Sequence, residues 1–271
     1  MTAVSGAVRG WRSRLFVAGT AAFVVVFVVM ALMLIVADVW YVCANPQAAR
    51  EVISKEIWAA LKLSVVTSVI TVAIALLFAI PMGYALSRYH FRGHIIVDTI
   101  VDLPIIFPPL VAGLTLLIFF RTPLGTWIED SGFQFVYQVK GIILCQLLVS
   151  ASFAIRTVKS TFDEIDRRQE DVSLTLGCTQ GQAFFRVALP MAKNGIIAGG
   201  ILAWARAFGI FGPLMIFVGA VRMRTEVLPT TIYLEQSIGR LEVAIAVALL
   251  MIVIASVALI GIRLLGGRRL W

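Results

Sequence analysis

Residues 15–37 read LFVAGTAAFVVVFVVMALMLIVA, an apolar stretch without a charged side chain. A helix of about 20 apolar residues is long enough to cross the hydrocarbon core of a bilayer. Arg9, Arg12 and Arg14 precede the stretch, as basic residues precede the core of a secretory signal peptide. The stretch is longer than the roughly 7–15 residues of such a core, and no small-residue cleavage site closes it. We therefore predict an uncleaved first transmembrane helix.

The rest of the chain has the same apolar character. Hydrophobic residues make up 60% of the 271 residues and charged residues 14%, with a mean hydropathy of +0.96. A soluble domain carries about a quarter charged residues, so the composition excludes an ordinary soluble enzyme. Five further apolar runs follow, at about Ile57 to Leu86, Ile95 to Phe120, Gly141 to Val158, Asn194 to Val218 and Val243 to Leu265. We predict an all-α membrane protein with six transmembrane helices. Residues 1–14 would precede a transmembrane domain at 15–271, whose core spans about 57–265.

The distribution of basic residues predicts the orientation. Lys and Arg accumulate in cytoplasmic loops of membrane proteins. One side would hold both ends of the chain, the Arg88–Arg92 loop and residues 159–193, and it carries most of the 23 Lys and Arg. We therefore predict that both termini are cytoplasmic. No basic cluster is interleaved with aromatic residues as a nucleic-acid groove would require, so we expect no nucleic-acid partner.

Residues 159–193 form the only long segment on this predicted cytoplasmic side, and we call them the 159–193 loop. Thr161 with Glu164 has the spacing of a capping box and predicts a helix start. Gly177 predicts a left-handed helix stop. Thr179 with Gln182 predicts a second start, and Pro190 would end that second helix. The loop would thus hold two short helices, whose apolar sides must be buried against something else.

One run within this loop matches a known pattern. The residues Asp171-Val172-Ser173, Gly177 and Val187-Ala188-Leu189-Pro190 resemble the EAA loop of permease subunits of ABC importers. That pattern reads Glu-Ala-Ala, three residues, Gly, nine residues and Ile-x-Leu-Pro, and the spacing fits at every step. Asp171 stands in place of Glu, Val172 and Ser173 in place of the two Ala, and Val187 in place of Ile. The resemblance implies insertion into a cleft on a cytoplasmic ATPase subunit, whose closure the loop transmits to the membrane helices. The residues expected to take part are Asp171, Val172, Ser173, Gly177, Thr179, Phe184, Val187, Leu189 and Pro190.

The resemblance continues outside the loop. Residues 102–104, 108–114 and 123–125 look like the third span and following loop of molybdate and sulfate permeases. Residues 205–212 resemble their fifth span, although Ile210 stands where the usual pattern has an acid. Residues 225–233 are similar to the loop before their last helix.

This resemblance implies a type I ABC importer permease in the inner membrane of a bacterium or archaeon. It would carry a tetrahedral oxyanion: molybdate, or sulfate or tungstate. The implied partners are a second permease chain (identical or different), ATPase subunits that hold ATP-Mg, an extracytoplasmic binding protein and membrane lipid.

The sequence lacks the motifs typical of catalytic, nucleotide-binding and metal sites. It contains no Gly-x-x-x-x-Gly-Lys-Ser/Thr phosphate loop, no nucleophile with a positioned base and no metal-ligand spacing. We expect that the chain is not an enzyme and that it binds no cofactor or metal.

Arg206 is the candidate pathway residue. It lies about twelve residues into the fifth run, roughly 18 Å deep at 1.5 Å per residue. A charge near mid-membrane is a functional candidate by default. Arg206 could line the route of a dianion, or it could form an ion pair with Asp98 or Asp102.

Two aromatic residues are candidates for a gate. Phe208 and Phe211 precede the Gly212-Pro213 pair, where proline must disturb the helix. They could form a constriction or could simply pack.

A rival interpretation of the whole chain is a self-contained transporter or channel driven by an ion gradient. It would need intramembrane carboxylates, for which Asp98 and Asp102 are the only candidates. Within the ABC class, another small anion or solute remains an alternative substrate.

Overall fold

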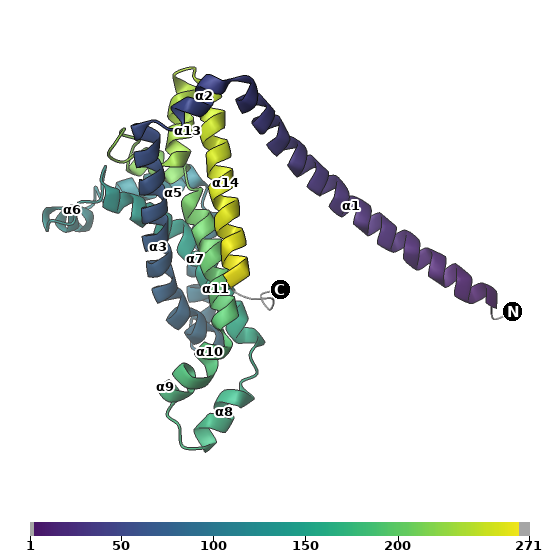
Figure 1. Ribbon diagram of the computed structural model, residues 1–271. Helices are drawn as coiled ribbons and strands as arrows, with labels where there is room; N and C mark the ends of the chain where they lie inside the picture. The colour runs from purple at the N-terminus through teal and green to yellow at the C-terminus, as the bar shows by residue number, and fades with distance from the viewer. Residues whose placement is uncertain (1–2, 266–271) are drawn as a thin grey trace.

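The protein is a bundle of helices in the computed structural model, which describes the backbone of residues 3–265 and the side chains of residues 16–47 and 50–261. Figure 1 shows the long helices side by side, with α1 leaving the bundle obliquely. The helices are α1 (Ala3–Ala44), α2 (Pro46–Glu51), α3 (Lys55–Arg88), α4 (His94–Ile106), α5 (Pro109–Phe119), α6 (Pro123–Asp130), α7 (Val139–Glu164), α8 (Arg168–Thr175), α9 (Gln180–Ala183), a π-helical turn (Phe184–Ala188), α10 (Leu189–Met191), α11 (Lys193–Phe208), α12 (Gly212–Phe217), α13 (Leu228–Ser237) and α14 (Leu241–Leu265).

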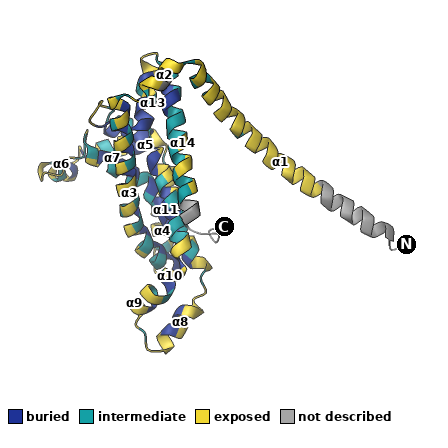
Figure 2. Ribbon diagram, viewed as in Figure 1, coloured by how far each residue is buried: buried dark blue, intermediate teal, exposed yellow. Residues whose placement is uncertain are grey.

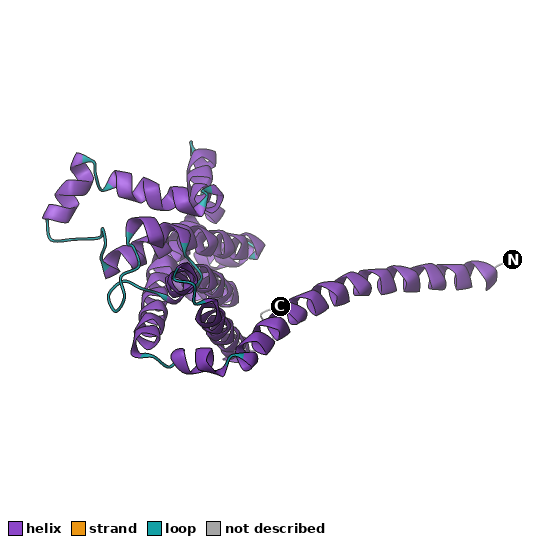
Figure 3. Ribbon diagram, turned by 90° about the horizontal axis from the view of Figure 1, so that it is seen from above, coloured by secondary structure: helices purple, strands orange, loops and turns teal. Residues whose placement is uncertain are grey.

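Membrane crossings account for most of these helices. Four segments are long and apolar enough to cross without interruption: Phe16–Ala44, Lys55–Arg88, Val139–Glu164 and Leu241–Gly261. Two bent pairs raise the number to as many as six if each pair is one span, namely α4 with α5 at 112° and Gln180–Met191 with α11 at 68°. The described residues contain helices and loops but no strand (Figure 3). The prediction of an all-α membrane protein with six crossings is confirmed, with two of the crossings bent.

A disturbance at Gly212-Pro213 was predicted, but the break in the third run was not. The third apolar run was expected to be one helix, but α4 ends at Ile106 and α5 begins at Pro109. Pro108 has no N–H to continue the ladder and restricts the residue before it, which explains the interruption. The fifth run was expected to reach Val218, but α11 ends at Phe208 and α12 starts only at Gly212.

The centre of the bundle is built from α3, α7 and α11. Ala75, Ala154 and Ala203 are fully buried where these helices meet. Small residues allow transmembrane helices to approach closely. Gly83 shows how closely, because a Cβ added there would lie 2.8 Å from a methyl of Val158. The central helices therefore form one packed unit within the chain.

Helix α1 lies apart from this unit. It begins at Ala3, before the apolar run predicted from Leu15. Only its carboxyl-terminal part reaches the bundle, next to α2 and α14 (Figures 1 and 3). None of its spanning window is buried, as Figure 2 shows by colour. This long apolar surface must face lipid or another subunit.

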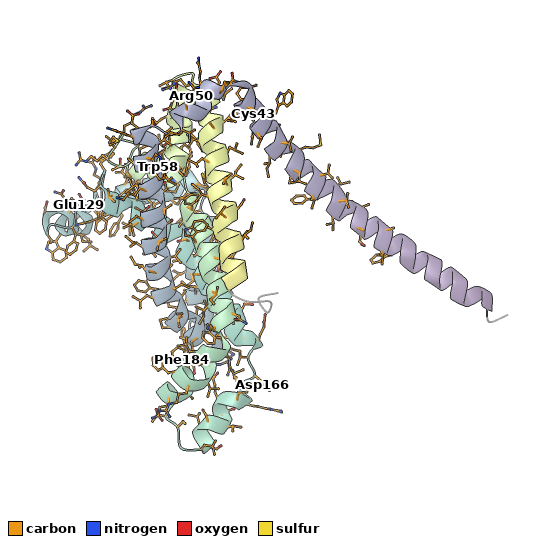
Figure 4. All side chains as sticks on the ribbon, in the orientation of Figure 1. Cys43, Arg50, Trp58, Glu129, Asp166 and Phe184 are labelled. Atoms are coloured by element: carbon orange, nitrogen blue, oxygen red, sulfur yellow. The ribbon has the colours of Figure 1, made fainter. Side chains whose placement is uncertain are left out.

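Two ends of the bundle can be distinguished. The loop end carries α8 and α9, and Figure 4 labels Asp166 and Phe184 there. The far end carries α2 and the amino-terminal part of α3, with Arg50 and Trp58 labelled. Helix α1 starts and α14 finishes toward the loop end (Figure 1). Both described ends of the chain thus lie on the side of the 159–193 loop, as the basic residues predicted.

A charged network closes the far end. The segment expected to be a loop before the last helix is largely the helix α13, and the amide of Leu228 at its start donates to Ser64 Oγ of α3 at 2.8 Å. Arg222 then bridges Glu56 of α3 at 2.6 Å and the buried Glu235 of α13 at 2.7 Å. These contacts fix α13 against α3.

Glu226 is a buried carboxyl at this end. It precedes α13, outside the spanning segments, and its residue is 3% exposed. Burial raises the pKa of its carboxyl, as do the nearby Glu56 and Glu235, while Arg222 opposes them. The unfolded carboxyl has a pKa of about 4.3, so the folded state binds the proton more tightly. The resulting stability is complete below that value and is lost as pH rises through the folded pKa.

We therefore expect Glu226→Gln to stabilise the protein at alkaline but not acidic pH. The thermal midpoint in detergent, followed by tryptophan fluorescence, should rise by about 2–4 °C near pH 8 and be unchanged near pH 4. A difference that does not depend on pH would contradict this assignment.

Candidate functional site

The turn between α8 and α9 agrees with its sequence signals. Gly177 has φ +89°, the left-handed value expected of a helix stop. Its amide donates to Leu174 O at 3.0 Å, and the amide of Cys178 donates to Ser173 O at 3.1 Å. Thr179 and Gln182 form the predicted capping box, with bonds of 3.3 and 2.9 Å. Local chemistry alone thus specifies the turn.

The outer boundaries of the helix pair differ from prediction. Thr161 lies inside α7, where its hydroxyl donates to Thr157 O, and α7 continues to Glu164. The first short helix starts only at Arg168, whose amide donates to Asp166 Oδ1 at 3.0 Å. Pro190 does not stop the second helix, because the π-helical turn leads into α10, which reaches Met191. The second helix ends one residue beyond Pro190, and the chain then bends by 68° into α11.

A buried ion pair fixes α8 to the end of α3. Glu170 is 7% exposed and accepts from Tyr84 Oη at 2.6 Å and from Arg88 Nε at 2.8 Å. Arg88 also donates to Ile165 O at 3.1 Å. The Tyr84 ring packs edge-on against Phe184, with centroids 4.7 Å apart. Hydrogen bonds and an ion pair therefore join α8 directly to α3.

The opposite side of the helix pair is open. Val172, Leu176 and Phe185 are 58%, 80% and 67% exposed. The other residues of the motif divide by position: Ser173 is buried, Phe184, Val187 and Leu189 are half-buried, and Asp171, Thr179 and Pro190 are exposed. The apolar surface that the sequence expected to be buried is thus left uncovered by this chain, at its tip.

Asp98 and Asp102 do not pair with Arg206. Both carboxylates bind the guanidinium of Arg156 on α7, with Asp98 at 3.0 Å, and Lys159 lies 3.9 Å from Asp98. The two acids are one turn apart on α4 and face α7. Arg156 lies eight residues from the loop end of α7, whereas Arg206 lies thirteen residues from the loop end of α11. The proposed pairing with Arg206 is wrong for this reason.

Arg206 instead lines a cavity of about 530 Å³, which we call the break cavity. Its walls come from both helix breaks and from α7: Pro104, Ile105, Phe107, Pro109, Leu110, Val149, Phe153, Arg206, Gly209, Ile210, Phe211, Gly212 and Pro213. Arg206 Cζ lies 4.5 Å from the centroid of the Phe153 ring. Among the described residues no carboxylate pairs with it. Arg206 is an exposed residue, so its positive charge faces the open space of the cavity.

The two predicted gate residues lie in different environments. Phe211 lines the break cavity. Phe208 does not, because it is 2% exposed and stacks on Trp204 at 5.1 Å in the core beside α14. Close backbone approach brings the two breaks together: a Cβ on Gly113 of α5 would lie 2.8 Å from Pro213 Cα. Phe211 remains the gate candidate, and Phe208 is a packing residue.

Sequence reasoning missed Glu170 and Arg156. Glu170 is separated from Tyr84 by 86 positions, and no local pattern joins them. Arg156 could have been found from depth alone, because it ends the fourth apolar run near the level at which the third run carries its acids.

Comparison with known families resolves the class of the protein. Residues 75–270 match the family model of binding-protein-dependent transport system inner membrane components. The chain belongs to this family. It is therefore a multi-pass permease-type subunit of a transport system, as the motif in the 159–193 loop implied.

Relatives of this permease are named for oxyanions. A probable molybdenum ABC transporter permease of Haloferax volcanii is 34% identical, covering 80% of this chain and 79% of that protein. The molybdate/tungstate permease WtpB of Pyrococcus abyssi is 40% identical over 58% of this chain, which matches 59% of that protein. The sulfate permease CysT of Escherichia coli is 29% identical, covering 86% and 81%. Similarity is thus shared by molybdate, tungstate and sulfate systems.

Solved structures show the same fold at low identity. A chain of the bacterial alginate ABC transporter superposes with a TM-score of 0.67 at 17% identity, covering 89% of this permease and 94% of that chain. A chain of the MetNI methionine ABC transporter, in inward-facing conformations, gives 0.62 at 17% identity, covering 84% and 99%. The type I importer fold expected from the sequence is confirmed.

Proposed function

We propose that this permease forms the membrane pathway of an ATP-driven importer for a tetrahedral oxyanion, with molybdate or tungstate the first candidates and sulfate the next. The observation that carries the proposal is the position of Arg206 in the break cavity without a carboxylate partner among the described residues. A dianion can balance this charge where no side chain does. The names of the relatives point to the same class of ion.

The surroundings of Arg206 suit an anion. Ile210 lines the cavity at the position where similar permeases usually have an acid, so no negative charge stands there to repel the ion. Pro109 and Leu110 in the first turn of α5 also line it, and the amino end of a helix carries partial positive charge. Interrupted helices supply free backbone groups at membrane depth in many transporters.

The 159–193 loop would couple this pathway to a separate ATPase subunit. Its uncovered apolar tip offers a docking surface, and the Glu170 pair joins α8 to α3. ATP and Mg²⁺ would bind to that partner, because this sequence lacks a phosphate loop. A second permease chain would pack against the uncovered α1, and an extracytoplasmic binding protein would dock at the far end. The pairing of Asp98 and Asp102 with Arg156 weighs against a proton- or sodium-driven mechanism.

Reconstitution tests this proposal. Proteoliposomes would contain the permease with its ATPase and receive binding protein loaded with labelled molybdate, tungstate or sulfate. ATP-dependent uptake of one of these ions is expected. Uptake by the permease alone, without ATP, would replace the proposal by the gradient-driven alternative.

Arg206→Gln should lower the maximal uptake rate about 10- to 100-fold, because a charge-assisted contact contributes about 1.5–3 kcal/mol. Arg206→Lys keeps the charge and should retain part of the rate. The control is Arg121→Gln, an exposed residue that does not line the cavity. Equal uptake by Arg206→Gln and by the control would remove Arg206 from the pathway.

A further inference from the structure

Gln146 of α7 is a buried amide at the level of the break in α11. It is 2% exposed and does not line the break cavity. Its Oε1 accepts from Thr71 Oγ1 at 2.9 Å. Its Nε2 donates to Thr67 Oγ1 at 3.3 Å and to the backbone carbonyl of Ala207 at 3.1 Å. Both amide protons are therefore used, and α3, α7 and α11 meet at one side chain.

The bond to Ala207 has a specific cause. Because α11 stops at Phe208, the carbonyls of its last turn lose their partners within the helix. The carbonyl of Ala205 accepts from Gly209 at 3.3 Å, but that of Ala207 is reached by the amide of Ile210 only at 3.5 Å. A carbonyl freed at membrane depth must find another donor. Gln146 supplies it from the neighbouring helix.

The two threonines depend on Gln146 much less. Thr67 Oγ1 already donates to Leu63 O at 2.8 Å within α3. A threonine on a helix can always return its hydroxyl to a carbonyl three or four residues earlier. Of the three partners, the Ala207 carbonyl is thus the one for which Gln146 matters most.

We propose that Gln146 is a positioning residue of the transport pathway: its amide holds the broken end of α11 in place. Arg206 and the cavity wall at Gly209–Phe211 flank the carbonyl that it binds. Losing the amide would let this wall shift without removing any group that faces the cavity. The inference rests on the proposed function only in treating the cavity as the pathway.

The test compares two variants in the complex with the ATPase. Gln146→Met keeps an unbranched side chain of similar length and removes every hydrogen bond. Thr71→Val is the matched control, because it removes the bond to Oε1 and leaves the amide nitrogen on Ala207. Hydrogen exchange of residues 208–212 and the rate and KM of anion uptake are measured for both.

In Gln146→Met, exchange of residues 208–212 should rise about tenfold, while peptides of α3 and α14 exchange as before. Maximal uptake should fall about tenfold at unchanged KM for the loaded binding protein, because misplacement of a pathway group slows the step it serves. Thr71→Val should change both quantities less than about twofold. A merely structural role would instead raise exchange throughout the bundle.

Unchanged exchange at 208–212 in Gln146→Met overturns the proposal, and so does an equal effect of Thr71→Val. If the Met variant does not purify as a folded complex, Gln146→Asn keeps a buried amide with a shorter reach. It should show the same local rise in exchange, and its absence would also overturn the proposal. Exchange is measured without any anion, so a wrong substrate assignment abolishes uptake in every variant but leaves this comparison intact.

Discussion

Transporters with Glu170→Leu are expected to lose most ATP-dependent uptake while the membrane bundle still folds. The substitution leaves the Arg88 guanidinium, 7% exposed as a side chain, without its carboxylate. Removing one member of a buried ion pair costs about 3–5 kcal/mol, because the remaining charge stays buried. Here that free-energy cost weakens the contact between α8 and α3. Uptake should drop at least about tenfold, and less ATPase should co-purify with the permease.

A double variant distinguishes the effect of an unpaired Arg88 charge from the effect of the changed side chain at position 170. Glu170→Leu combined with Arg88→Met removes both charges, and such replacements are often neutral or stabilising. We expect the double variant to recover much of the uptake that the single variant loses. Gln169→Leu, at the exposed neighbouring position, is the control for an added leucine on α8. Arg88→Met alone is measured as well. If the losses in Glu170→Leu and Arg88→Met simply add in the double variant, the ion pair does not couple α8 to α3.

The membrane spans could be predicted because each depends on a continuous local property. Every apolar run in the sequence contains the main body of a helix in the structure. The breaks were harder, since proline alone does not decide them. Pro81 and Pro104 lie inside helices, whereas Pro108 follows an interruption. The three prolines have the same backbone chemistry, so the residue type alone does not tell which of them marks a break.

In the candidate site, too, local features could be predicted from the sequence and long-range contacts could not. The turn at Gly177 was predictable, because three neighbouring residues specify it. The pairs that connect the site to the bundle join residues 54 to 86 positions apart, as in Arg156 with Asp102 and Glu170 with Tyr84. Nothing in the spacing of such residues marks them as partners. Arg206 was selected for its depth in the apolar run, and its partner was assigned by charge alone. In the structure both acids pair with Arg156 instead.

Gly177→Val should uncouple the transporter by changing one backbone angle. At φ +89° a residue with a side chain pays about 1–2 kcal/mol, and a β-branched residue more. A Cβ at this position would meet nothing within 4 Å, so crowding contributes nothing. Gly177→Asn is therefore the matched control, because asparagine tolerates left-handed backbone and adds similar bulk.

Relief of the strained angle in Gly177→Val would break the two bonds that close the turn, from Gly177 to Leu174 O and from Cys178 to Ser173 O. α9 would then lose its fixed direction relative to α8, and the two helices could no longer present one docking surface. We expect ATP-dependent uptake and ATPase co-purification to fall about tenfold or more in Gly177→Val, and less than about threefold in Gly177→Asn. The thermal midpoint of the isolated permease should be the same in both, because the turn lies at the tip and supports no part of the core. Equal loss in the two variants would show that bulk at the docking surface, rather than the direction of α9, limits coupling.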